Sequence, residues 1–201
     1  MLIVYGAAKS RAVRTLWMLG ELGIAYEHKN WLPRSTDTQT AAFGALNPNR
    51  RVPIIDDEGF VLSESMAINL YLAKKHKSPL YPTDPHQEAL AWQWSLWETD
   101  RLDRQIVNHA RHTQDLPVAE RKPEVAKAAW EECVIAFDVL EVALNKTPYL
   151  ASAQFSVADL NVASALYRGL VLDLSLWPKT NAWLHRCWER AAAQKAQQMR
   201  G

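Results

Sequence analysis

The stretch "NRRVPIIDDEGFVLSES", residues 49–65, decides the fold of this chain. Two apolar runs, PIID at 53–56 and FVLS at 60–63, flank a short segment that contains Gly59. Because glycine can adopt the positive φ that tight hairpin turns need, the stretch predicts two antiparallel strands. A proline precedes the first strand, and Glu64-Ser65 follows the second, directly before a helical pattern. This framing of the hairpin indicates a binding role for its two ends.

The groups at these ends suit a short peptide ligand. A Val52-Pro53 pair just before a strand is where a cis peptide bond would turn the chain, leaving the backbone of Val52 unpaired by the sheet. Ser65 begins a helix, so its amide and hydroxyl form an anion site that the helix dipole strengthens. Glu64 could accept hydrogen bonds from an α-amino group, and Arg51 could pair with a second carboxylate. The predicted ligand is zwitterionic at one end and anionic at the other.

The rest of the first 76 residues alternates between strand and helix patterns. LIVY at 2–5 is a short apolar run, and the next segment places Val13, Leu16 and Trp17 at helical spacing before Gly23. Further strand and helix patterns are IAYEHKNW at 24–31, TDTQTAAFGAL at 36–46 and SMAINLYLAKKH at 65–76. Residues 1–76 therefore predict a domain of the order βαβαββα.

Residues 77–87, KSPLYPTDPHQ, contain three prolines without a periodic pattern, which predicts a linker between two domains. Beyond it we find no convincing strand pattern. Long helices are predicted over 88–112 and 123–144 from their apolar periodicity. The predicted fold class is therefore α/β plus all-α, with an all-helical domain over 88–201. The final segment, 190–201, is polar enough to fray.

One helix start in the second half is unusually well specified. In QFSVADLNVASALYRGL, residues 154–170, Ser156 can cap a helix while Asp159 reaches back to the Ser156 amide. Phe155 and Leu160 stand at the positions of a hydrophobic staple. The helix is apolar nearly all round, so we expect it to run through the middle of the helical domain in a structural role.

The composition excludes several classes of partner. The chain of 201 residues has 23 Lys plus Arg against 22 Asp plus Glu, so we expect neither nucleic acid nor a membrane surface. No stretch approaches the roughly 18 apolar residues of a membrane helix, and the N-terminus lacks a signal-peptide pattern, which predicts a cytoplasmic protein. The two cysteines, Cys133 and Cys187, lack zinc-type spacing, so we expect no metal.

Together, these features resemble the glutathione transferase superfamily, in its bacterial, serine-type cytosolic form. The resemblance covers essentially the whole chain and rests on the segments YGAAKSRAVRTLWMLGELGIAYE, NPNRRVPIIDDEGFVLSESMAINLYLAKKH and FSVADL. It implies a thioredoxin-like N-terminal domain, an all-helical C-terminal domain and glutathione as co-substrate.

The resemblance also assigns the hairpin residues to parts of glutathione. It implies that Val52 pairs with the cysteinyl backbone and that Pro53 is cis. Glu64 and Ser65 would hold the γ-glutamyl end. Arg51 stands where the family often has glutamine or lysine near the glycyl carboxylate.

One departure from the family pattern is Arg50, where the family often has glycine. It puts two arginines side by side in the loop. They could raise the affinity for anionic ligands, or the loop could differ from that of the family.

The serine-type branches of the family use a hydroxyl at the start of the first helix, and GAAKS places Ser10 at that position. Ser10 would donate a hydrogen bond to the glutathione thiolate and would not itself be a nucleophile. A free thiol with a pKa of about 8.5 is only a few per cent ionised at neutral pH. The hydroxyl, the helix N-terminus and Arg11 would together lower that pKa. Tyr5 is the alternative donor, because other branches use a tyrosine near the end of the first strand.

The electrophile is expected to bind between the domains, along the first long helix of the second domain. Trp97, Asp100 and Arg104 fall three to four residues apart and could share a face toward that pocket. The same spacing is typical of core or of salt-bridged surface. The resemblance further implies a two-fold homodimer, with the first two helices of the second domain at the interface.

The sequence thus predicts an enzyme that attaches glutathione to an electrophilic carbon of a hydrophobic small molecule, in detoxification or in a dedicated catabolic step. A glutathione-dependent disulfide reductase or peroxidase is one alternative. A catalytically silent family member that binds proteins or carries ligands is another, because a fold alone does not fix a function.

Overall fold

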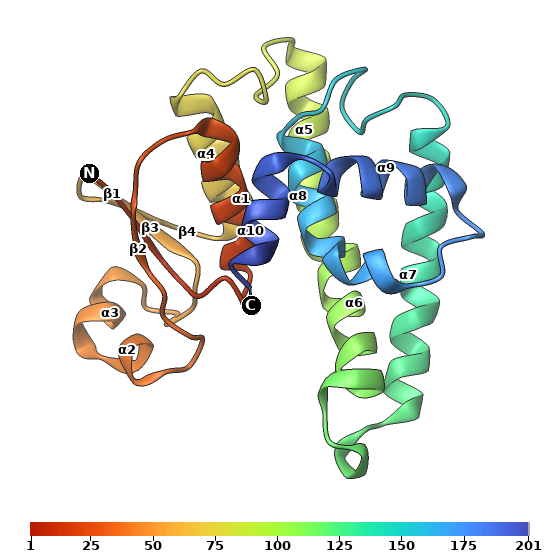
Figure 1. Ribbon diagram of the computed structural model, residues 1–201, viewed down its shortest axis with the longest axis horizontal. Helices are drawn as coiled ribbons and strands as arrows, with labels where there is room; N and C mark the ends of the chain where they lie inside the picture. The colour runs from red at the N-terminus through yellow and green to blue at the C-terminus, as the bar shows by residue number, and fades with distance from the viewer. Residues whose placement is uncertain (201) are drawn as a thin grey trace. The chain divides into compact units, whose positions relative to one another are not determined.

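The computed structural model describes residues 1–200 and divides into two compact units (Figure 1). The first unit contains residues 1–81 together with the segment that starts at Glu189, and the second contains residues 82–188. The sequence pattern predicts that this last segment belongs to the helical domain, whereas in the structure it groups with the first unit.

The first unit is built on a mixed four-stranded sheet, as predicted. Its strands are β1 (Leu2–Tyr5), β2 (Glu27–Lys29), β3 (Ile54–Asp57) and β4 (Phe60–Ser63), in the order β2-β1-β3-β4. Strand β1 runs parallel to β2 and antiparallel to β3, and β3 pairs with β4 as the predicted hairpin. The turn of the hairpin contains Gly59 at a φ of 94°. The quoted stretch therefore forms half of the sheet.

The helices of this unit are α1 (Ala12–Leu22), α2 (Thr36–Gln39), α3 (Ala41–Leu46), α4 (Ser65–Lys75) and α10 (Ala191–Gln198). Helix α1 packs against both α4 and α10, and Figure 1 shows the three side by side. The predicted stripe of Val13, Leu16 and Trp17 is buried. Helix α1 ends where Gly23, at a φ of 63°, donates its N–H to the carbonyl of Leu19.

The polar end of the chain, for which the sequence predicts fraying, contains helix α10, which packs against α1. Its polar residues lie on the outer face, and a face of small alanines, with Ala193 at 0% and Ala196 at 2% exposure, is buried. Because a Cβ on Gly20 of α1 would lie 3.1 Å from the Cβ of Ala192, the two helices approach closely. Composition alone did not reveal that a mostly polar segment had a partner surface.

The described part of the second unit contains helices and no strand. They are α5 (Pro85–Trp97), the π-helical segment η1 (Glu98–Leu102), α6 (Asp103–Ala110), the π-helical segment η2 (Arg111–Asp115), the 3₁₀ turn η3 (Val118–Glu120), α7 (Pro123–Leu144), α8 (Val157–Ala165), the 3₁₀ segment η4 (Leu166–Val171) and α9 (Pro178–Trp188). The single helix predicted over 88–112 is thus interrupted by a π-turn, which carries the buried carboxyl side chain of Glu98.

The capping arrangement of α8 is confirmed. Ser156 Oγ accepts from the Ala158 amide at 3.2 Å, and Asp159 Oδ2 accepts from the Ser156 amide at 2.9 Å. Every residue of α8 is buried, as expected for a central helix. Asp159 Oδ1 also accepts from the Leu150 amide and from Trp183 Nε1, at 2.8 and 2.9 Å. The cap therefore joins α8 to its own preceding loop and to α9.

Candidate active site

The turn that carries Ser10 lies between β1 and α1, and its first residues are hydrogen-bonded to the end of β2 and the segment that follows it. Gly6 donates its N–H to the Lys29 carbonyl at 2.9 Å, and Ala7 donates to the Trp31 carbonyl at 2.7 Å. These bonds continue the pairing of β1 with β2 beyond the end of the ladder. The backbone leading to Ser10 is thereby held by the sheet.

Gly6 brings this turn against the start of the hairpin. Its φ is 135°, and a Cβ at this position would lie 2.8 Å from the Cβ of Ala12 and 3.0 Å from the Cβ of Val52. Real Cβ atoms do not approach so closely, so the contact requires glycine. The structure thus brings the start of α1 and Val52 together, although the sequence analysis did not identify Gly6.

Ser10 stands just before α1 and is half-buried. Its Oγ donates to the Ala7 carbonyl at 2.7 Å and accepts from the Ala12 amide at 3.1 Å. The second bond satisfies one of the first amides of α1, as a capping hydroxyl does. The hydroxyl therefore lies at the positive end of the helix dipole, where an anion is stabilised.

Tyr5, the alternative hydroxyl, belongs to the core. It is 8% exposed and packs against Trp31 and Phe43, with ring centroids 5.1 and 6.0 Å away. Burial, followed by the charge of Asp56, raises the pKa of the Tyr5 phenol. These surroundings do not favour a group that must meet a thiolate.

The Val52-Pro53 peptide bond is cis, as the resemblance implied. The ladder between β1 and β3 begins with the pair Tyr5 and Ile54, so Val52 lies two residues before the paired strand. Asn47 supports this segment, because its side-chain amide donates to the Arg51 carbonyl at 2.9 Å. The backbone of Val52 is therefore not paired within the sheet, and the residue before it is held by the side chain of Asn47.

The two neighbouring arginines have different surroundings. Arg50, at a φ of 50°, donates from Nη1 to the Gln39 carbonyl and, at 2.8 Å, to the Thr40 carbonyl. Its guanidinium lies against Gly44, where a Cβ would be 2.7 Å from Nη2. The guanidinium of Arg50 thus binds the carbonyls between α2 and α3, whereas Arg51 is exposed. The guanidinium of Arg50 is therefore engaged within its own segment of the first unit.

Glu64 and Ser65 mark the start of α4. Glu64 is exposed and has a φ of 70°, a backbone conformation that costs a non-glycine residue of order 1–3 kcal/mol and is enriched at functional sites. Ser65, 6% exposed, is the first residue of α4. Asn69 Nδ2 donates to the Arg14 carbonyl at 3.4 Å, and both residues lie in the N-terminal half of their helices. The starts of α1 and α4 are therefore brought near one another.

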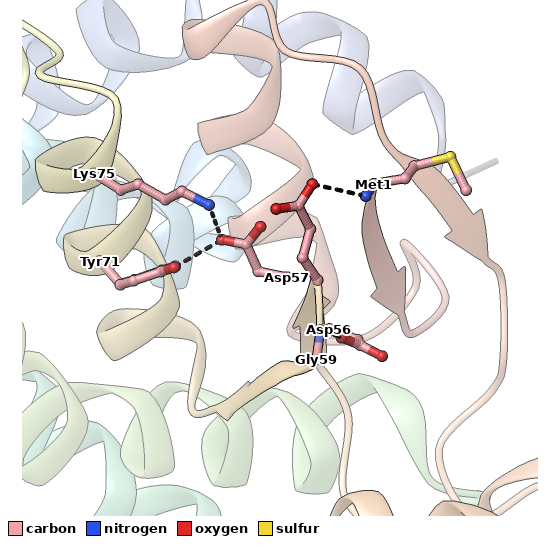
Figure 2. Close-up of polar contacts among 7 residues, drawn as sticks. Met1, Asp56, Asp57, Gly59, Tyr71 and Lys75 are labelled. Atoms are coloured by element: carbon pink, nitrogen blue, oxygen red, sulfur yellow. Dashed lines mark hydrogen bonds and ion pairs between the residues drawn. The ribbon is translucent and has the colours of Figure 1, made fainter.

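A polar cluster that the sequence analysis missed fixes α4 to the hairpin. Figure 2 shows Asp57, at the end of β3, facing Tyr71 and Lys75 of α4. Asp57 Oδ2 accepts from the Tyr71 hydroxyl at 2.7 Å and from the ammonium of Lys75. Burial by itself raises the pKa of Asp57, but the bonds from Lys75 and Tyr71 outweigh it and hold this pKa below its ordinary value. Tyr71 and Lys75 are four residues apart in a predicted helix, and this spacing is the sequence signal that the two side chains share a face.

The three predicted electrophile residues lie in different surroundings. Trp97 stacks on Trp94, with ring centroids 5.1 Å apart, and lines a hollow of about 240 Å³ that Arg101 of η1 and residues of α7 also border. Asp100 is exposed and forms an ion pair with Arg101 at 2.9 Å. Arg104 is exposed. Because the π-turn inserts a residue after Trp97, the regular spacing on which the prediction rested is broken.

Neither a metal-binding cluster nor a membrane-spanning helix is found among residues 1–200. No group of three or more His, Cys, Asp or Glu side chains in this part of the chain could hold a metal ion. No helix there is both long and apolar enough to cross a membrane.

Comparison with known proteins covers both units. The family model "Glutathione S-transferase, N-terminal domain" matches residues 1–74, and the model "Glutathione S-transferase, C-terminal domain" matches residues 87–191. Glutathione S-transferase GstB of Escherichia coli (strain K12) is 28% identical over 201 residues, which cover 97% of each chain. Glutathione S-transferase theta-1 of Bos taurus is 33% identical over 154 residues, covering 72% of this chain and 64% of that protein.

Solved structures agree with these matches. The theta class glutathione S-transferase of the citrus canker pathogen Xanthomonas axonopodis pv. citri, with glutathione bound, has a TM-score of 0.90 at 30% identity and covers 97% of this chain and 96% of its own. A glutathione S-transferase from Pseudomonas fluorescens has a TM-score of 0.83 at 29% identity, covering 95% and 96%. Because the family models match both the sheet unit with its helix starts and the helical unit, this chain belongs to the glutathione S-transferase family.

Proposed function

We propose that the protein conjugates glutathione to an electrophilic carbon of a hydrophobic small molecule and that Ser10 stabilises the attacking thiolate. The observation that carries the proposal is the position of the Ser10 hydroxyl at the N-terminus of α1, where it caps Ala12, a residue that lies with Val52 around Gly6. In the reaction the thiol proton leaves to solvent, the sulfur forms a bond to carbon, and the leaving group departs with its electron pair.

The Ser10 proton must change partners in this mechanism. At present Oγ donates to the Ala7 carbonyl. Rotation of the O–H bond would direct the proton to the sulfur, while the Ser10 amide, 2.9 Å from the same carbonyl, keeps that acceptor satisfied. The exchange therefore leaves no buried carbonyl without a hydrogen bond.

The remaining contacts to glutathione are proposed from the geometry of the hairpin ends. The backbone of Val52, which the cis bond to Pro53 follows, would pair with the cysteinyl unit. Ser65, at the start of α4, would bind the γ-glutamyl carboxylate, and Glu64 would accept from its α-amino group. Arg51, exposed beside Val52, would meet the glycyl carboxylate.

A homodimer is part of the proposal. The first two long helices of the second unit, α5 and α7, expose apolar side chains at helical spacing, which are Trp92, Leu96, Ile135, Val139 and Val142. Exposed apolar side chains on neighbouring turns are typical of protein interfaces. The roles of Trp97, Asp100 and Arg104 toward the electrophile, and the cytoplasmic location, stay predictions.

A spectroscopic pH titration of bound glutathione tests the proposal. Thiolate absorbance would be followed for the wild type and for Ser10→Ala. A pKa that is lowered in the wild type and rises by about one unit in the variant, equivalent to ~1.4 kcal/mol, supports the serine mechanism. Bound glutathione with an unperturbed pKa in the wild type would contradict it and favour a silent carrier.

A further inference from the structure

Helix α10 is fixed at its beginning to the end of α1. Arg190, the residue before α10, donates from Nε and Nη2 to the two carboxylate oxygens of Glu21, at 2.7 Å each. Glu21 also accepts from Trp17 Nε1 at 2.9 Å. A paired guanidinium and carboxylate of this geometry fix orientation as well as distance.

The other end of this segment reaches the turn that carries Ser10. Arg200 Nη1 donates to the Ala8 carbonyl at 3.1 Å. Since Arg190 lies beside the last turn of α1 and Arg200 beside the residues that precede α1, the two helices run antiparallel. Ala8 is 2% exposed and lies two residues before Ser10.

The orientation of the Ala8 peptide group affects where the Ser10 hydroxyl points, because Ala8 lies in the same turn. The preceding residues, Gly6 and Ala7, are bonded to the β2 side of the unit. Arg200 contacts the next residue from the α10 side. Because hydrogen bonds weaken steeply with distance and angle, a small rotation of the peptide planes between Ala7 and Ser10 would misdirect the hydroxyl.

We propose that Arg200 is a positioning residue for Ser10 and that α10 acts as a strut, anchored at Arg190, which holds Arg200 against the turn. The inference rests on the proposed role of Ser10 toward the glutathione thiolate. Arg200 acts through the Ala8 carbonyl and not as a charge on the sulfur. Its loss therefore changes the acidity of the bound thiol by way of the serine hydroxyl.

The first experiment compares Arg200→Met, which keeps an unbranched apolar stem but has no donor, with Arg200→Lys, which keeps a donor. Lys195→Met is the matched control, because Lys195 is an exposed cation of helix α10, which directly precedes Arg200. We expect Arg200→Met to raise the pKa of the bound thiol by about half a unit and to lower kcat at neutral pH roughly threefold. Arg200→Lys should restore most of the difference, and Lys195→Met should match the wild type.

A double-mutant cycle with Ser10→Ala separates the possible causes. If Arg200 acts through Ser10, adding Arg200→Met to Ser10→Ala produces little further rise in the thiol pKa. A rise of the same size in both backgrounds overturns the inference, because it means a direct effect of charge. A lower Tm for Arg200→Met with an unchanged thiol pKa also overturns it, since Arg200 would then be structural only. If Ser10→Ala itself leaves the thiol pKa unchanged, the proposed function of Ser10 fails independently of Arg200.

Discussion

The Ser10 hydroxyl donates a hydrogen bond to the Ala7 carbonyl at 2.7 Å, so its single proton points into the turn that precedes α1. A serine in this place has two roles in one geometry, since its oxygen also caps the Ala12 amide while its proton can rotate outward. The Ser10 hydroxyl that caps α1 is therefore the same group that would donate a hydrogen bond to a thiolate. This coincidence suggests a direct chemical test at position 10.

Substitution Ser10→Cys should convert the turn into a thiol site. A helix N-terminus lowers the pKa of a thiol, so the introduced thiolate should attack one sulfur of oxidised glutathione, form a mixed disulfide and release the other glutathione as thiolate. Intact mass after incubation with oxidised glutathione would show one glutathione adduct. The native Cys133 should not react, because burial, followed by the charge of Glu132, raises its pKa to about 12.

The matched control is Ser35→Cys, at the start of the four-residue helix α2. Such a short helix has little dipole, so its thiol should react much more slowly. Equal rates of adduct formation at the two positions would contradict a special environment for Ser10.

Substitutions of the adjacent Arg50 and Arg51 should have different effects, one on stability and the other on glutathione binding. Arg51→Ala should raise the KM for glutathione about three- to tenfold, because it removes a charge-assisted contact to the glycyl carboxylate. Arg50→Ala should instead lower the free energy of unfolding by about 1 kcal/mol, since it removes the donor to the Gln39 and Thr40 carbonyls. Steady-state kinetics and thermal melting of both variants test this. The reverse pattern, with the KM effect at position 50, would refute the assignment of Arg51.

Gly6→Ala should damage both the fold and glutathione binding. The added methyl group would overlap the Cβ atoms of Ala12 and Val52 at 2.8 and 3.0 Å, and a φ of 135° is poor for alanine. We expect a loss of more than about 2 kcal/mol in stability and a higher KM for glutathione. The control is Gly23→Ala, where no atom lies within 4 Å of the new Cβ although φ is 63°. That change should cost about 1 kcal/mol and leave the KM unaltered.

Much of the architecture could be predicted from the sequence because it rests on local signals. The hairpin around Gly59 and the cap at Ser156 each lie within a few residues of chain. Contacts between distant segments left no such signal. The approach of Gly6 to Val52 and the bond from Arg200 to Ala8 depend on how the chain folds back over many residues. The polar composition of residues 190–201 predicts fraying, but composition does not reveal that the alanines of helix α10 pack against α1.

Asp57→Asn should lower stability in a pH-dependent way. The folded-state pKa of Asp57 lies below its ordinary value of 3.8, because the bonds from Lys75 and Tyr71 outweigh the effect of burial. Its stabilising contribution is therefore fully present above about pH 4 and is lost as the pH falls through the folded-state value. Urea titrations should show a deficit of about 1–2 kcal/mol at pH 7 that shrinks toward pH 2. Glu58→Gln, at an exposed neighbour, should show almost no deficit. A deficit for Asp57→Asn that is constant with pH would mean that shape and not charge matters.

The cap of α8 should show a graded loss of stability without loss of ligand binding. Ser156→Ala removes one capping oxygen and should cost about 1 kcal/mol. Asp159→Asn should cost about 3 kcal/mol, because its carboxylate accepts from the Leu150 amide, the Trp183 indole and both donors of Ser156, and an amide group would oppose at least one of them. For a chain of this length each kcal/mol lowers Tm by roughly 2–4 °C, so the melting curves should differ clearly. The KM for glutathione should be unchanged in both variants, because the cap lies in the second unit and the proposed glutathione contacts lie in the first. Equal melting of the two variants would contradict the wider role assigned to Asp159, whereas a raised KM would mean that the cap also shapes the glutathione site.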